Sequence, residues 1–79
     1  MEIKVLGTGC PKCKILEKNV RDAIVEMNIQ AEISKVQDII DIMNYGIMRT
    51  PGLVIDEKVV SSGHLLTVSQ VKEIIAKNQ

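Results

Sequence analysis

The chain has 79 residues, a length that allows a single domain covering positions 1–79. Hydrophobic residues make up 46% and charged residues 25%, which is ordinary for a globular protein and argues against disorder. The formal net charge is +0, and the chain has one Tyr but no Trp or Phe. Because nucleic-acid binding needs a surplus of Lys and Arg or a platform of aromatic side chains, we expect no nucleic-acid partner.

No window of about 20 apolar residues is present, so we expect no membrane-spanning segment. The apolar start of the sequence is too short and too regular for a signal peptide. We therefore expect a cytoplasmic protein. In that compartment a small chain with two Cys is more often catalytic or metal-binding than held together by a structural disulfide.

The first part of the chain predicts a strand, a long helix and a second strand. Residues 2–6 alternate weakly and end at a loop flanked by glycines. Pro11 suits the first position of a helix, and apolar residues then recur at helical spacing. We therefore predict an amphipathic helix over residues 11–28 and a short strand over residues 31–34.

A second, shorter helix is predicted directly after that strand. Ser34 and Gln37 have the spacing of a capping box, which marks the start of a helix. Gly46 suits a left-handed cap at its end. The apolar residues expected in this helix are Val36, Ile39, Ile40 and Met43.

The last part of the chain predicts a hairpin and a terminal helix. Residues 53–55 and 59–61 are two runs typical of strands, separated by three polar residues. Thr67 and Gln70 form a second capping box, after which apolar residues at helical spacing predict a helix over residues 68–77.

The predicted order is β-α-β-α-β-β-α. Two strands joined through a helix favour a right-handed parallel crossover, whereas the hairpin supplies an antiparallel pair. The expected fold class is therefore α/β, with a four-stranded mixed sheet and helices on both of its faces.

Cys10 and Cys13 lie at the predicted junction between the first strand and the long helix, one helical turn apart. The N-terminus of a helix has a partial positive charge and free N–H groups, which favour a thiolate. Lys12 and Lys14 add positive charge, and cysteines in such settings have a lowered pKa. Cys10 is expected to be the exposed nucleophile and Cys13 the resolving thiol that closes the disulfide.

Two other interpretations of the cysteine pair stay open at this point. The pair could be buried and inert, although a glycine-rich loop and a helix-opening proline are unusual surroundings for a core pair. A structural zinc site needs four ligands, and the chain has two Cys and one His, so we expect no closed metal site. Metal capture by the two thiolates, or by a dimer, remains an alternative.

Thr50 and Pro51 come directly before the third predicted strand, where a proline by itself would mark only a strand boundary. Combined with the cysteine pair, this arrangement resembles the thioredoxin superfamily. It is most similar to the very small archaeal and bacterial thioredoxin-like and glutaredoxin-like redox-active disulfide proteins. The segments that match are residues 7–13, 45–51 and 62–63.

The resemblance implies a thioredoxin-like fold and a thiol–disulfide oxidoreductase that reduces or exchanges protein disulfides. It implies that the bond between Thr50 and Pro51 is cis and faces the disulfide. It further implies that the backbone beside Pro51 pairs with the substrate strand, and that the proline helps to keep metal ions away from the thiols. It also implies that no cofactor is needed besides the redox-active disulfide. The expected partners are disulfide-bearing proteins and a thioredoxin-reductase-like or other reductant donor, and we expect a monomer.

The sequence also departs from the family pattern. Lys12 replaces the aromatic residue that glutaredoxins have between their cysteines, and Gly9 replaces the Trp before the first Cys of thioredoxins. Lys4 stands six residues before the first Cys, where thioredoxins have a buried acid. Substrate choice is therefore expected to depend on Thr8, Lys12, Met48 and the backbone of Thr50 and Pro51.

Two functions of other classes are kept as alternatives. A small copper or zinc carrier can also have a C-x-x-C motif between a strand and a helix, but such carriers follow the order β-α-β-β-α-β. They usually have a Met two residues before the first Cys, where this chain has Thr8. The second alternative is a redox-regulated binding adaptor that holds a partner without turnover.

Overall fold

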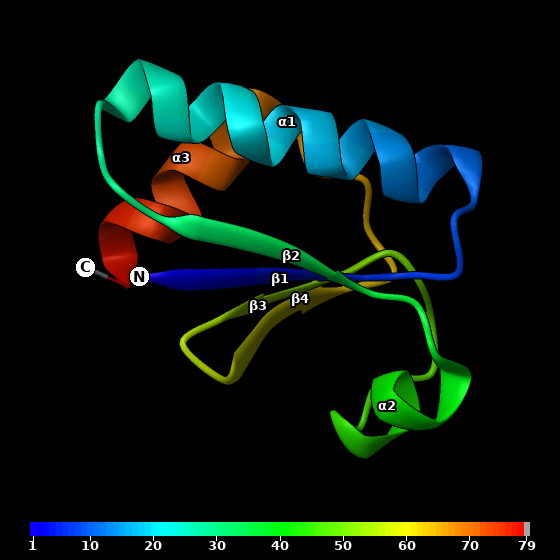
Figure 1. Cartoon of the computed structure of the whole chain (residues 1–79). Helices are drawn as coiled ribbons and strands as arrows, with labels where there is room; N and C mark the ends of the chain where they lie inside the picture. The colour runs from blue at the N-terminus through cyan, green and yellow to red at the C-terminus, as the bar shows by residue number, and fades with distance from the viewer. Residues whose placement is uncertain (79) are drawn as a thin grey trace.

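A computed structural model describes residues 1–78 of the chain (Figure 1). It confirms the predicted order of elements and the α/β class with a four-stranded mixed sheet. The elements are β1 Glu2–Leu6, α1 Pro11–Met27, β2 Glu32–Val36, α2 Ile39–Asn44, β3 Gly52–Ile55, β4 Lys58–Ser62 and α3 Val68–Lys77. Among the described residues, no helix is long and apolar enough to cross a membrane.

The sheet is organised around β1, in the strand order β2-β1-β3-β4. Strand β1 pairs in parallel with β2, where Leu6 faces Val36, and antiparallel with β3, where Leu6 faces Gly52. Strand β3 pairs antiparallel with β4. The segments after β1, β2 and β4 and the segment before β3 therefore meet at one end of the sheet.

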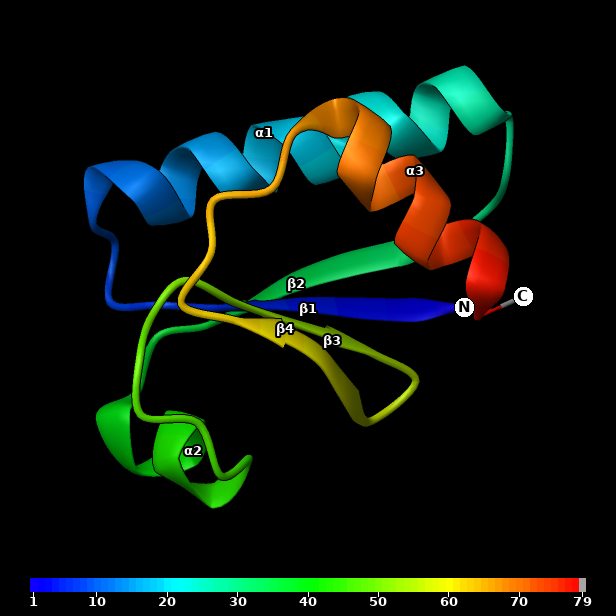
Figure 2. The ribbon, with the colours of Figure 1, turned by 180° about the vertical axis from the view of Figure 1, so that it is seen from behind.

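The helices cover both faces of the sheet, as expected. Helices α1 and α3 lie together on one face, and α2 lies on the other face near the end where the loops meet (Figures 1 and 2). The larger core lies under α1 and α3, and a smaller one lies between the sheet and α2. The smaller core consists of Leu6, Ile42, Ile47 and Val54, with Val36 and Tyr45 packed against it.

The boundary between β2 and α2 differs from the prediction. The capping box of Ser34 and Gln37 is wrong, because β2 continues to Val36, whose carbonyl accepts a hydrogen bond from the N–H of Gly7 at 2.9 Å. The helix is capped by Asp38, whose Oδ1 accepts from the backbone N–H of Ile40 at 2.8 Å. Pairing with β1 thus overrides the local capping pattern.

Most apolar residues of this helix face outward, and one of those predicted for it lies elsewhere. Ile39, Ile40 and Met43 are 62%, 70% and 65% exposed, and only Ile42 of the helix is buried. The later start of the helix changes which face meets the sheet, because Ile42 contacts the smaller core and its apolar neighbours face outward. Val36, which we assigned to the helix, lies on β2. The predicted left-handed conformation of Gly46 is confirmed, with φ of 81°.

The hairpin and the terminal helix are confirmed with one adjustment. The connection contains two residues, Asp56 and Glu57, both with positive φ, and Lys58 already belongs to β4. Two left-handed residues match the right-handed twist of the flanking strands. The capping box of Thr67 and Gln70 at the start of α3 is present in full.

The corrected start of α2 leads to a stability prediction. Replacing Asp38 with Ala removes the acceptor for the first N–H groups of the helix, and should lower the free energy of unfolding by about 1 kcal/mol in urea denaturation. The control is Ser34→Ala on exposed β2, which should change the free energy by less than about 0.5 kcal/mol. An equal or larger loss at Ser34 would restore the original capping assignment.

Candidate functional site

The two cysteines form a disulfide at the start of α1. Cys10 is the N-cap residue and half-buried, and its Sγ accepts a hydrogen bond from the N–H of Cys13 at 3.3 Å. Cys13 lies one turn further along the helix and is only 6% exposed. The two sulfurs therefore differ in access to solvent, and Cys10 is the one that a second molecule reaches more easily.

The backbone before the disulfide leaves room for Cys13 because residue 7 has no side chain. A Cβ built on Gly7 would lie 2.9 Å from Cβ of Cys13 and still closer to its Sγ. The same Cβ would lie 4.0 Å from Cβ of Thr50. Gly7, Cys13 and Thr50 are thus in close proximity, and a larger residue at position 7 would displace the sulfur.

The peptide bond between Thr50 and Pro51 is cis. Pro51 is buried, and its carbonyl accepts a hydrogen bond from the N–H of Gly63 at 2.9 Å, which ties this loop to the end of β4. The pairing of Leu6 with Gly52 places the loop beside the segment that leads to Cys10. Both loops consequently lie at the same end of the sheet.

Three of the residues on which substrate specificity is expected to depend line one open pocket of about 440 Å³. Thr8, Met48 and Thr50 come together there with the outward face of α2. Met48 is 99% exposed. Lys12 is exposed on the first turn of α1 and does not line this pocket. The remaining lining residues are Ile39, Ile42, Met43, Gly46 and Ile47.

Ile39 and Met43 were missed as site residues by the sequence analysis, which named them only as apolar residues of the short helix. Their apolar character and helical spacing are the same for a buried face and for a binding face. One feature of the sequence could have indicated their exposure. The helix has six residues, and four of them are apolar, which is more than one face of so short a helix can bury.

The side chain of Lys4 forms its contacts on the face of the sheet opposite α1. Its Nζ donates to the hydroxyl of Tyr45 at 2.9 Å and to Oε1 of Glu57, and forms an ion pair with Oε1 of Glu2 at 3.2 Å. The bond to Glu57 is the main cause that raises the pKa of Lys4 above its ordinary value, and the same bond lowers the pKa of Glu57. Tyr45 packs against the smaller core, so Lys4 points to the face of the sheet opposite α1.

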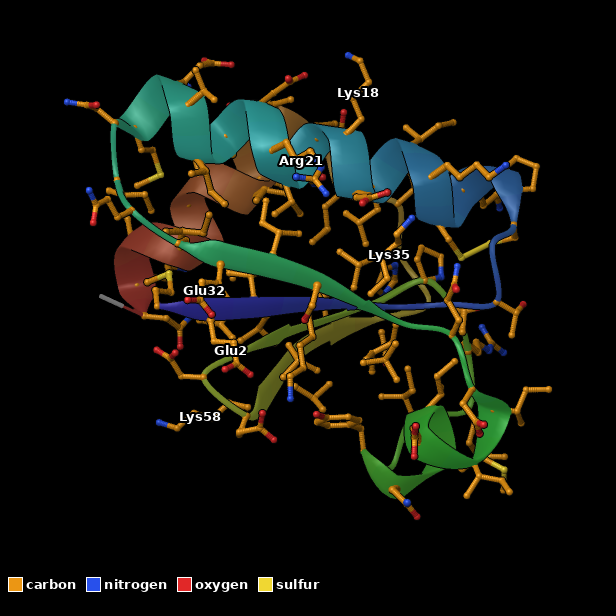
Figure 3. All side chains as sticks on the ribbon, viewed as in Figure 1. Glu2, Lys18, Arg21, Glu32, Lys35 and Lys58 are labelled. Carbon is orange, nitrogen blue, oxygen red and sulfur yellow. A yellow bond between two sulfur atoms is a disulfide. The ribbon has the colours of Figure 1, made fainter. Side chains whose placement is uncertain are left out.

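A second, much smaller cavity of about 30 Å³ lies beside the buried sulfur of the pair. Cys13 shares this cavity with Glu17 from the next turn of α1 and with Lys35 from β2. In Figure 3 the labelled Lys35 lies between α1 and the sheet, on the same side of the molecule as Arg21. The other lining residues are Val5, Gly7, Gly9, Lys14 and Gln37.

The side chain of Glu17 has two cationic partners. Its Oε2 accepts from Nη2 of Arg21 at 2.9 Å, and its Oε1 lies 3.6 Å from Nζ of Lys35. The hydrogen bond from Arg21 is the main cause that lowers the pKa of Glu17, which is therefore ionised at neutral pH. Within residues 1–78, no group of three or more His, Cys, Asp or Glu is placed to hold a metal ion.

Comparison with known proteins agrees with this geometry. The model of a family described as thioredoxin domain matches residues 1–76. A thioredoxin of Methanothermobacter thermautotrophicus is 36% identical over 76 residues, covering 96% of this chain and 99% of the relative. A thioredoxin of Methanocaldococcus jannaschii is 41% identical over 71 residues, covering 90% of this chain and 81% of the relative. The chain therefore belongs to the thioredoxin family and is a thiol–disulfide oxidoreductase.

Proposed function

We propose that Cys10 is the nucleophile and Cys13 the resolving cysteine of a protein disulfide reductase. In the reduced protein, the thiolate of Cys10 attacks one sulfur of a substrate disulfide, and the other substrate sulfur leaves as a thiolate. Cys13 then loses its proton and attacks Sγ of Cys10, which breaks the mixed disulfide. Two electrons have passed to the substrate, and a reductant donor must reduce the Cys10–Cys13 disulfide again.

The position of Cys10 at the start of α1 is the observation that supports this assignment most. The helix has 17 residues and no acidic residue in its first turn, so nothing there offsets the positive end of its dipole. Lys12 and Lys14 follow directly. The N–H of Cys13 already donates to Sγ of Cys10, and this contact favours a thiolate at the same atom.

For substrate binding, we propose the backbone of Thr50 and Pro51 together with the open pocket beside it. The pocket is lined largely by aliphatic and Met side chains, including Met43 and Met48, and suits an apolar side chain next to the substrate cysteine. Thr8 lines the pocket from the loop that precedes Cys10, and Lys12 lies on the first turn of α1.

Membership of the thioredoxin family supports disulfide-bearing substrates and a reductase partner in general. We propose protein disulfides as the substrates and a thioredoxin-reductase-like flavoprotein or another thiol reductant as the donor. We further propose that the protein acts as a cytoplasmic monomer whose cysteine pair needs no added cofactor.

Substitution of each cysteine tests the proposed roles. Cys10→Ser should abolish reduction of insulin disulfides by a dithiol reductant, because the mixed disulfide cannot form. Cys13→Ser should also stop turnover, but it should leave a covalent complex with the substrate that mass spectrometry detects. The proposal would be contradicted if neither substitution lowers the rate, or if the covalent complex forms through Cys13 in Cys10→Ser and not through Cys10.

The pocket is tested by a charge placed on its wall. Ile39→Asp should raise KM for insulin by about tenfold, because an apolar side chain then meets a carboxylate, and should leave reduction of a small aromatic disulfide almost unchanged. Val25→Asp is the matched control, because Val25 is 77% exposed on α1 and does not line the pocket. Equal effects of the two substitutions, or none from Ile39→Asp, would show that the pocket does not bind substrate.

A further inference from the structure

The small cavity beside Cys13 takes no part in the exchange steps proposed for the two cysteines. Its volume of about 30 Å³ exceeds the 10–15 Å³ or so that one water molecule needs. Three charged side chains line it: Lys14 and Glu17 from α1 and Lys35 from β2. Water can therefore reach the buried sulfur in a space whose electrostatic character is set by these three groups.

The balance of charge around the cavity is positive. The charge of Glu17 is largely offset by Arg21, which binds Oε2 at 2.9 Å, so Lys14 and Lys35 outweigh it. The other residues that line the cavity carry no charge: Val5 comes from β1, Gly7 and Gly9 come from the loop after it, and Gln37 follows β2. Thr50, which lies near Gly7, is also uncharged.

This balance matters because Cys13 must become a thiolate in the resolving step. Burial disfavours the charged form of a thiol, and Cys13 is 6% exposed. The family's usual acidic position is occupied by Lys4, which is bound to Glu57 and Tyr45 on the opposite face. Besides the start of α1, the groups that line the cavity are the source of charge that can compensate this burial.

We propose that Lys35, held in place by Glu17, is a positioning residue that stabilises the thiolate of Cys13 across this cavity. This inference rests on the proposed function of the cysteine pair. The proton of the Cys13 thiol passes to water in the cavity and on to solvent. The thiolate forms a bond to Sγ of Cys10, and the bond between Cys10 and the substrate breaks, with its electron pair on the substrate sulfur.

Lys35 is preferred over Lys14 because it has a carboxylate partner that directs its ammonium group toward α1. Its Nζ lies 3.6 Å from Oε1 of Glu17, whose side chain is only 15% exposed. Both lysines are exposed, Lys35 with 52% of its side chain, but no carboxylate within residues 1–78 forms an ion pair with Lys14. An anchored ammonium group exerts its charge at one place, whereas a free one spends most of its time in solvent.

The test follows the two chemical steps separately. The reduced protein is mixed with 5,5′-dithiobis(2-nitrobenzoate), whose first thiol release reports attack by Cys10 and whose second reports resolution by Cys13. In Lys35→Met, we expect the second step to be about tenfold slower at neutral pH, because the midpoint of its pH profile moves up by about one unit. The profiles should converge at alkaline pH, and the first step should be unchanged.

Lys72→Met is the matched control. Lys72 on α3 also forms an ion pair with a Glu of α1, since its Nζ lies 3.0 Å from Oε1 of Glu26, but it does not line the cavity. Its pH profile should be that of the unmodified protein. In Glu17→Gln the second step should slow at neutral pH by less than in Lys35→Met, because Lys35 loses the carboxylate that holds it while the cavity also loses a negative charge.

Three results would overturn the inference. One is a pH profile of Lys35→Met that equals that of the unmodified protein. Another is a slowing of the second step by the same factor at every pH, which would indicate a structural effect. The third is a slower second step in Glu17→Gln without one in Lys35→Met, which would make Glu17 the proton acceptor.

Failure of the proposed function would look different, because the unmodified protein would then not reduce insulin disulfides and Cys13→Ser would not retain a covalently bound substrate. The effect on Cys13 can still be measured in that case, by NMR titration of the reduced protein. Lys35→Met should raise the pKa of Cys13, and an unchanged pKa would overturn the inference.

Discussion

The site depends on the double pairing of β1. Leu6, the last residue of this strand, pairs with Val36 on one side and with Gly52 on the other. These two pairings bring the loop of Cys10, the end of β2 and the loop of Thr50 to one place. Residue 7 must then be glycine, because Cys13 occupies the space where a Cβ would lie. A register shift at Leu6 would move every part of the site at once.

In the proposed mechanism, the two sulfurs receive positive charge mainly from different sources. Cys10 caps α1 at the positive end of the helix dipole, whereas Cys13 lies one turn deeper beside the cavity that Lys35 helps to line. The chain has a net charge of +0, so this local excess of cations reflects their placement rather than composition. Lys4, which occupies the position of the usual acid, is bound by carboxylates on the other face and leaves the sulfurs to these groups.

Periodic patterns predicted most of the fold, because α1, α3 and the hairpin follow from local spacing and caps. The pattern failed at Ser34, where pairing with β1 extended β2 and left Asp38 as the cap. It also failed for Ile39, because an apolar residue that faces a pocket has the same spacing as one in a core. The pairing of Glu17 with Lys35 depends on the register between a helix and a strand, which no local pattern contains.

The central claim is that Cys10 is the reactive thiolate and Cys13 the protected partner. Alkylation of the reduced protein with iodoacetamide across a pH series, with each cysteine quantified by peptide mass spectrometry, tests it most directly. The account predicts that Cys10 is modified first, with a midpoint clearly below the ordinary thiol pKa of about 8.5, and that Cys13 reacts much more slowly. Modification of Cys13 first, or of both cysteines together with an ordinary midpoint, would contradict it.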